Sequence, residues 1–300
     1  INLGYAQIML SAEGPLTNLS GNRYNHSFQI QEFRRPEFEV TARNETTGPY
    51  FVQDHAVVAV EAEYYAGGPL PNAEVNWRIN ASPTNYRPPN WPDFSFGYWT
   101  PWWWYFGMGS DGEPQFQDFT GRTDASGNHY LRLDFESSEQ PRPYSVMAES
   151  TVFDVNRQAW AGTTSLMVHP ADLYVGLRSE RYFVEQGTPL DIDLIATDLD
   201  GNPIAGETIE VEAFRLVWKN TPDGWQEQEE DLQTCSPESG EEPVSCSFET
   251  PAGGRYQITA TITDQAGRRN QSRITRWVSG GERPPAREVE RETVNLIPDQ

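Results

Sequence analysis

The chain has 300 residues, of which 37% are hydrophobic and 12% aromatic, enough to build the cores of about two globular domains. Its 44 acidic residues outnumber 22 basic ones, and the net charge of -22 disfavours binding to nucleic acid or to an anionic membrane surface. Metal and histidine-based catalytic sites are not indicated either, because none of the four histidines, His26, His55, His129 and His169, lies in a metal-ligand spacing.

Apolar and polar residues alternate with period two along the whole chain, which predicts β-strands. The clearest segments, in chain order, are 26–33, 56–65, 73–79, 190–196 and 255–263. Clusters of glycine, proline and asparagine separate these segments and favour turns. The i, i+3, i+4 spacing of an amphipathic helix is scarce, so we expect an all-β chain.

An internal repeat indicates the domain organisation. The segment YFVQDHAVVAVEAEYYAGGPLPNAEVNWRI from Tyr50 aligns with YFVEQGTPLDIDLIATDLDGNPIAGETIEVEAFRL from Tyr182. Each copy then reaches a glycine turn, a strand containing Tyr130 or Tyr256, and a last strand. The period is on the order of 110 to 130 residues, the size of one β-sandwich of the immunoglobulin or fibronectin-III kind.

We therefore predict tandem antiparallel β-sandwiches, with one complete domain at residues 36–170 and a second at 171–280. Residues 1–35 are predicted to be the C-terminal strands of a preceding domain. Residues 281–300 are predicted to be a linker and the first strand of the next domain. The sequence shows no signal peptide and no apolar run of about 18 residues. It opens inside a predicted strand and closes on VNLIPDQ, which looks like the start of another, so we interpret the chain as a piece of a longer protein.

The first predicted domain is longer because it contains an aromatic insertion at residues 82–114. Six prolines stiffen this segment and suit it to docking. We expect it to pack against a neighbouring domain or its own sheet, or to bind a partner, with sugar stacking as a further alternative. The candidate contact residues are Trp91, Trp99, Trp102, Trp103, Trp104 and Tyr105.

Cys235 and Cys246 are the only two cysteines. An exported protein would pair them across a small loop, whereas a cytosolic protein would keep two buried thiols. We favour a disulfide, which would stabilise the fold by roughly 2 to 3 kcal/mol in the chain-entropy model.

No catalytic or cofactor-binding motif is found, since the sequence contains no HExxH, GxSxG, P-loop or GxGxxG element. The segment DLDGN at 198–202 resembles part of a calcium loop but lacks the later ligands, so we interpret it as a turn. Paired carboxylates for glycoside hydrolysis would need a cleft lined by acidic groups. We predict no enzyme activity, no metal and no cofactor.

Three segments, HSFQIQEFRRPEFEV (26–40), YYAGGPLPNAEVNWRI (64–79) and VNRQAWAGTTSLMVHPA (155–171), together resemble the bacterial α2-macroglobulin family. The resemblance continues in YVGLRSERYFVEQG (174–187), the two cysteines and RWVSGG (276–281). It implies macroglobulin-like domains, which are seven-stranded antiparallel sandwiches, in a large protein of the bacterial periplasm or cell envelope. An upstream lipoprotein signal would make the parent a membrane-anchored lipoprotein.

The resemblance also implies a function, because family members look like endopeptidase inhibitors that trap proteases. A protease cuts a bait segment, the molecule rearranges, and a reactive thioester captures the protease. The thioester element Cys-x-Glu-Gln is missing here, because Cys235 is followed by Ser-Pro-Glu and Cys246 by Ser-Phe-Glu, and no bait segment is evident.

We therefore expect a structural scaffold fragment of such an inhibitor, without membrane insertion of its own. Its expected partners are neighbouring macroglobulin-like domains and, through the full-length protein, target proteases. The alternative is a cell-surface adhesin or carbohydrate-binding module that uses the tryptophan-rich insertion.

Overall fold

The computed structural model describes residues 4–11, 23–30, 37–98, 115–136, 140–221 and 224–280. Every regular element within these ranges is a β-strand, and the strands form five sheets. The described ranges contain no helix long and apolar enough to cross a membrane. The prediction of an all-β chain built from antiparallel sandwiches is confirmed.

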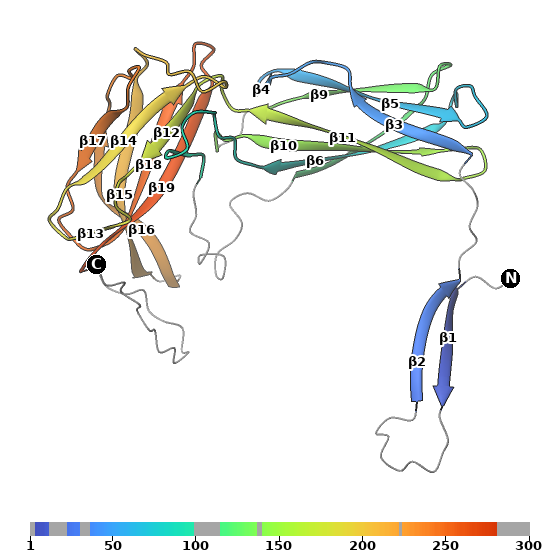
Figure 1. Cartoon of the computed structure of the whole chain (residues 1–300), viewed down its shortest axis with the longest axis horizontal. Coiled ribbons are helices and arrows are strands. Elements are labelled where there is room, and N and C mark those ends of the chain that lie inside the picture. The colour runs from blue at the N-terminus through green and yellow to red at the C-terminus, as the bar shows by residue number, and fades with distance from the viewer. Residues whose placement is uncertain are drawn as a thin grey trace.

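The first sandwich packs a five-stranded sheet against a three-stranded sheet (Figure 1). The larger sheet has the order β4 (Tyr50–Phe51), β11 (Ala159–His169), β10 (Tyr144–Phe153), β6 (Glu74–Pro83), β8 (Gln115–Arg122), and the smaller one β3 (Phe38–Asn44), β5 (His55–Tyr64), β9 (Asn128–Asp134). Apart from the parallel β4–β11 contact, all neighbours are antiparallel. Alternate side chains of the central strands therefore point into a shared core.

The core of the first sandwich is centred on Trp77, which is 1% exposed. Its indole Nε1 donates a hydrogen bond of 3.1 Å to Nδ1 of His129, so the buried polar atom of the tryptophan is satisfied. The imidazole lies against Gly121, where a Cβ would come within 2.0 Å of Nε2 of His129. Burial lowers the pKa of His129, which keeps the ring neutral and able to accept this hydrogen bond.

The second sandwich packs a four-stranded sheet against a five-stranded sheet (Figure 1). The first has the order β17 (Val244–Phe248), β14 (Leu190–Thr197), β12 (Tyr174–Arg178), β7 (Ser95–Phe96), and the second β13 (Phe183–Val184), β19 (Arg269–Val278), β18 (Gly254–Thr263), β15 (Ile209–Thr221), β16 (Gly224–Cys235). Its core contains Leu177, Ile192 and Ile258, each fully buried. Tyr256 is also buried, and its hydroxyl donates to the carbonyl of Ala252 at 2.9 Å.

Strands β1 (Gly4–Ser11) and β2 (Arg23–Ile30) form a separate two-stranded sheet (Figure 1). Leu10 lies opposite Tyr24, and Ile8 lies two residues away on the same face. These three side chains are 59%, 61% and 47% exposed, respectively. An isolated two-stranded sheet is marginally stable in water, so this apolar face needs a covering surface.

The predicted domain limits, 36–170 and 171–280, remain a prediction. The two large cores are made from residues on either side of position 170, as the repeat suggested. Strand β7 crosses this limit, because it lies within the predicted first domain and pairs with a strand of the second sandwich.

Cys235 and Cys246 form a disulfide with a Cα–Cα distance of 6.2 Å. Cys235 ends β16 in one sheet of the second sandwich, and Cys246 lies in β17 of the other sheet. The bond therefore joins the two sheets at their edges. Neither cysteine is left as a free thiol.

We expect the double substitution Cys235→Ala and Cys246→Ala to lower the free energy of unfolding by roughly 3 kcal/mol, because the unfolded chain loses the closure of a short loop. Urea denaturation with and without a reducing agent measures this loss. Reduction should destabilise the wild type by a similar amount and leave the variant unchanged. Equal stability of the oxidised wild type and the variant would contradict the prediction.

Candidate interface between the two sandwiches

The aromatic insertion of the first sandwich supplies a strand to the second. After β6, the chain reaches β7, where Phe96 pairs with Gly176 and Ser95 with Leu177 of β12. Two residues further on, Tyr98 forms a parallel bridge to Arg273 of β19. The segment thus lies against β12 of one sheet and β19 of the other sheet of the second sandwich and hydrogen bonds to both.

A third apolar cluster forms where the insertion lies on the second sandwich, and we call it the junction cluster. Phe94 and Phe96 are 4% and 8% exposed, although they lie in an insertion. Burial of side chains of this size contributes about 1.5 to 3 kcal/mol each. The members are Phe94, Phe96, Tyr174 and Ile195, with Tyr86, Trp91 and Leu199 packed against them.

Two hydrogen bonds orient the aromatic side chains of the junction cluster. The hydroxyl of Tyr86 donates to the carbonyl of Leu199 at 2.7 Å. The indole Nε1 of Trp91 donates to the carbonyl of Gly201 at 2.9 Å. Both acceptors lie in the turn between β14 and β15, so the turn holds the polar ends of two partly buried rings.

Glycines make this close approach possible. A Cβ at Gly176 would lie 2.7 Å from the ring of Phe96, and one at Gly201 would lie 2.1 Å from the carbonyl oxygen of Pro89. Gly201 also has φ +79°, a conformation that favours glycine. Any side chain at either position would push the insertion away from the second sandwich.

His169 at the end of β11 and Tyr174 at the start of β12 are buried on either side of the linker between the sandwiches, and Nδ1 of His169 lies 2.7 Å from the Tyr174 hydroxyl. Burial lowers the pKa of His169 to about 4 and raises that of Tyr174 above its usual range. The hydroxyl is therefore protonated and donates to the neutral imidazole. The ring of Tyr86 packs edge-on against His169, with 4.9 Å between the ring centroids.

An ion pair and a cation–π contact join the linker to both sandwiches. Arg268 of the second sandwich binds Asp264 at 2.7 Å and Asp172 of the linker at 3.3 Å. Its guanidinium lies 4.2 Å from the ring centroid of Phe51 in β4 of the first sandwich. Although burial would raise the pKa of Asp264, hydrogen bonds from the backbone and side chain of Arg268 lower it, so the carboxylate stays ionised.

The ring of Tyr98, which also belongs to the insertion, lies between two arginines. The guanidinium carbon of Arg142 is 5.0 Å from the ring centroid, and that of Arg273 is 4.3 Å from it. The Tyr98 hydroxyl donates to Oε1 of Gln271 at 2.6 Å. A cation–π contact contributes about 0.5 to 2 kcal/mol, less than the several kcal/mol that burial of an unpaired ion costs.

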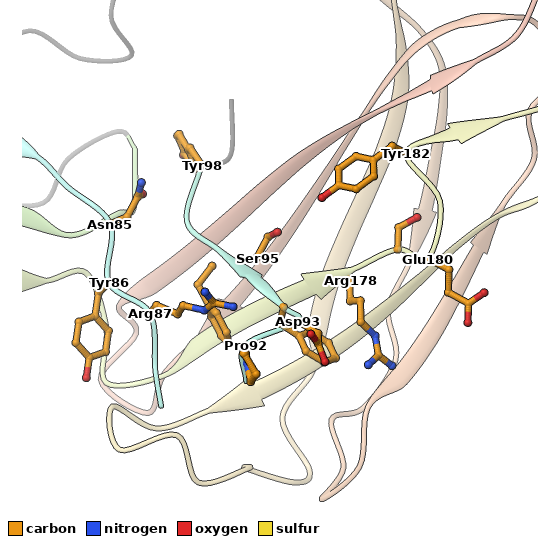
Figure 2. A pocket seen from close by; sticks show the side chains of 13 residues that line it. Asn85, Tyr86, Arg87, Pro92, Asp93, Ser95, Tyr98, Arg178, Glu180 and Tyr182 are labelled. Atoms are coloured by element: carbon orange, nitrogen blue, oxygen red, sulfur yellow. The ribbon is translucent and has the colours of Figure 1, made fainter. Parts of the chain in front are cut away.

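A surface pocket of about 620 Å³ opens between the insertion and the end of β12 (Figure 2). Asn85 and Tyr98 lie at one end, and Glu180 and Tyr182 lie at the other. Arg178 on the pocket wall is held by Asp193 at 2.8 Å. The lining carries both positive and negative groups, and nothing in it resembles a catalytic arrangement.

The structure places one of the six predicted contact residues, Trp91, in the junction cluster. Trp99, Trp102, Trp103, Trp104 and Tyr105 lie outside the described residues. The sequence reasoning missed Tyr86, Phe94, Phe96 and Tyr98, although the aromatic density of the insertion could have indicated them. Within the described ranges, no group of three or more His, Cys, Asp or Glu side chains could hold a metal ion.

No family model matches the chain. The α2-macroglobulin homologue of Nostoc is 23% identical over 295 residues, covering 93% of this chain and 14% of that protein. The α2-macroglobulin of Thermotoga maritima is 26% identical over 187 residues, covering 62% of this chain and 10% of that protein. Circularly permutated Ras protein 2 of Dictyostelium discoideum is 29% identical over 199 residues, covering 59% of this chain and 5% of that protein.

Solved structures give the same result for the fold. Trypsin-activated α2-macroglobulin from Escherichia coli superimposes with a TM-score of 0.55 at 16% identity, covering 94% of this chain and 19% of that one. Its native conformation gives a TM-score of 0.53 at 17% identity, covering 89% and 17% of the two chains. The resemblance to the bacterial α2-macroglobulins is confirmed.

The α2-macroglobulin-like chain spans a small share of its curated relatives, between 5% and 14% of their length. Its similarity to the solved α2-macroglobulins lies at 15% to 17% identity, which shows a shared fold. What this segment is shown to share with them is therefore the fold of the sandwiches.

We expect Gly201→Ala to weaken the junction of this α2-macroglobulin-like array more than Gly206→Ala does. Both glycines have positive φ, so both substitutions introduce similar backbone strain. Gly206 has no neighbouring atom within 4 Å, whereas the new methyl at 201 would collide with Pro89. The additional destabilisation should be about 1 to 3 kcal/mol in urea denaturation, with faster amide exchange at residues 86–98.

Equal loss of stability in the Gly201→Ala and Gly206→Ala variants would show that the contact with Pro89 contributes nothing. Unchanged amide exchange at residues 86–98 in the Gly201→Ala variant would lead to the same conclusion.

We expect acid to destabilise the wild type through His169. Because its folded pKa of about 4 lies below the ordinary value of 6.5, the unfolded chain binds a proton first as the pH falls. Stability from this group is present above pH 6.5 and is lost between pH 6.5 and 4, by roughly 3 kcal/mol at the lower end. Urea denaturation of the wild type and His169→Gln at several pH values measures this loss.

The His169→Gln variant retains a hydrogen-bond acceptor for Tyr174 and has no group that titrates at this position. Acidic residues elsewhere affect both proteins, so the difference between the two pH profiles isolates His169. Parallel profiles from pH 7 to 4 would contradict the prediction.

Proposed function

We propose that this chain is part of the framework of a protease-trapping macroglobulin, in which the two sandwiches form one rigid strut. The observation that carries the proposal is the pairing of β7 with β12, by which an insertion of one sandwich becomes a strand of the other. The junction cluster and the Arg268 contacts add apolar and ionic support at the same boundary. Such a joint transmits movement between distant parts of a large molecule.

The pairing of the two cysteines supports a framework role for this segment, not a role in covalent capture of a protease. A thioester requires a free cysteine next to glutamate and glutamine in the motif Cys-x-Glu-Gln, and both cysteines of the chain are joined to each other. In the framework role, bait cleavage and covalent capture belong to other parts of the parent protein. The disulfide also fits an oxidising compartment such as the periplasm or cell envelope, where we place the protein.

The N-terminal sheet supports the proposal that the array extends to a preceding domain. Each sandwich ends in an antiparallel pair of long strands, β10–β11 in the first and β18–β19 in the second. The β1–β2 pair occupies the equivalent place before the first sandwich, and its apolar face is exposed. We propose that this face packs against the opposite sheet of a preceding macroglobulin-like domain.

Incubation of the full-length parent with trypsin and with pancreatic elastase tests the framework role. We expect the parent to change shape and to retain the protease, as seen by size-exclusion chromatography and mass spectrometry of the complex. The 300-residue chain alone should form no complex with either protease. A parent that neither retains a protease nor changes shape would overturn the proposal.

Glycan binding distinguishes the framework from the adhesin alternative. In the framework role, the chain binds no glycan on an array of bacterial and host sugars. Binding that is lost in Trp102→Ala and Trp103→Ala would support a carbohydrate-binding module instead.

A further inference from the structure

The turn between β5 and β6 of the first sandwich is equivalent to the turn between β14 and β15 of the second. In each turn a glycine with positive φ, Gly67 or Gly201, donates its backbone N–H to the carbonyl three residues earlier, at 2.8 and 3.3 Å respectively. The register of these hydrogen bonds makes Tyr65 the counterpart of Leu199. The two turns can therefore be compared residue by residue.

These two turns differ in what covers them. In the second sandwich, Leu199 packs against the junction cluster, and a Cβ at Gly201 would lie 2.1 Å from the carbonyl oxygen of Pro89 in the insertion of the first sandwich. In the first sandwich, Tyr65 is 58% exposed, and a Cβ at Gly67 would meet no described atom within 4 Å. The turn that receives the preceding sandwich in one case is thus uncovered in the other.

A second pair of equivalent turns, between β10 and β11 and between β18 and β19, shows the same difference. From this turn of the second sandwich, Arg268 contacts Phe51 of the first. In the first sandwich the turn carries Val155, which is 89% exposed, and leads into Trp160, which is 44% exposed. The strand registers make Trp160 the counterpart of Asn270, which is fully buried.

Both turns of the first sandwich lie at its end that points away from the second sandwich (Figure 1). Strand β3 follows β2 after seven residues, 31–37, and a connection of this length spans at most about 25 Å. A domain that ends in β2 is therefore held near the first sandwich. Such tethering raises the effective concentration, so a contact too weak for separate molecules can form.

The edge of β3 does not offer the space that β12 offers to the insertion. Thr41 of β3 is the counterpart of Gly176, whose missing side chain makes room for Phe96. Strand β11 also lies close to β3, because a Cβ at Gly162 would come within 2.9 Å of the backbone nitrogen of Ala42. A preceding domain would therefore contact the first sandwich through its turns and not by donating a strand.

We propose that Tyr65, Val155 and Trp160 form the surface on which the preceding macroglobulin-like domain of the same chain docks. This inference rests on the proposed framework role, in which the β1–β2 pair belongs to such a domain. Aromatic side chains are favoured anchors at interfaces, and two of the three residues are aromatic. Because the contact shares no strand, it opens more easily than the junction between the two described sandwiches.

Hydroxyl-radical footprinting, read by mass spectrometry, compares the full-length parent with the 300-residue chain. We expect the oxidation rates of Tyr65 and Trp160 to fall about fivefold in the parent, since side chains in the centre of an interface are shielded from water. Tyr130 in β9, which is 52% exposed, is the internal control and should react equally in both proteins. Equal rates for Tyr65 and Trp160 in the two proteins would overturn the proposal.

Two variants of the parent separate docking from a local change around one side chain. Tyr65→Glu places a charge in the contact and should restore the oxidation of Trp160 to the rate of the 300-residue chain. Tyr130→Glu is the matched control and should leave Trp160 protected. Protection of Trp160 that survives Tyr65→Glu, or that is lost equally in both variants, would contradict a shared docking surface.

A photo-crosslinker identifies the domain that covers this surface. With benzoylphenylalanine in place of Tyr65 in the parent, we expect cross-links to residues that precede Ile1 in the same molecule. Cross-links to a second copy, to a later domain or to another protein would rule out the preceding domain. Neither measurement involves a protease, so a parent that traps no protease but forms these cross-links refutes the framework role and not the docking surface.

Discussion

The contact between Phe96 and Gly176 is the constraint on which the junction depends. A sheet edge presents unpaired backbone groups, and β12 would be such an edge if β7 did not cover it. The pairing succeeds because glycine leaves room for the Phe96 ring, which in turn buries Tyr174 and Ile195 beneath the insertion. Hydrogen bonding along the edge and apolar burial on the face therefore arise from the same two-residue strand.

The second sandwich protects the edge of its five-stranded sheet from pairing with another chain in a different way. Strand β16 is the edge of the five-stranded sheet, and it has no neighbour beyond it among the described strands. It carries Glu227, Glu229, Glu230 and Asp231, of which Glu229 and Asp231 are exposed. Charged side chains on an edge strand oppose pairing with another chain. One edge of the second sandwich is thus covered by β7, and another carries charged side chains.

Much of the fold could be predicted from the sequence, because alternation and turn residues are local signals. The strands around Ala56–Tyr65 and Arg255–Thr263 were expected within a few residues of β5 and β18. The path of the insertion could not be predicted, since β7 is two residues long and its partner Gly176 lies about 80 positions away. The arginines around Tyr98 were missed for the same reason, because Arg142 and Arg273 come together only in the folded chain.

The glycines of the junction have a consequence for assembly of a tandem array. Domains with similar sheets can associate in the wrong order during folding, and such misassembly is a characteristic failure of repeat proteins. The insertion of the first sandwich fits a surface that has no Cβ at positions 176 and 201. In a sandwich of the same fold with alanine at those positions, the methyl groups would collide with the insertion. The two glycines therefore determine which neighbouring domain can bind it.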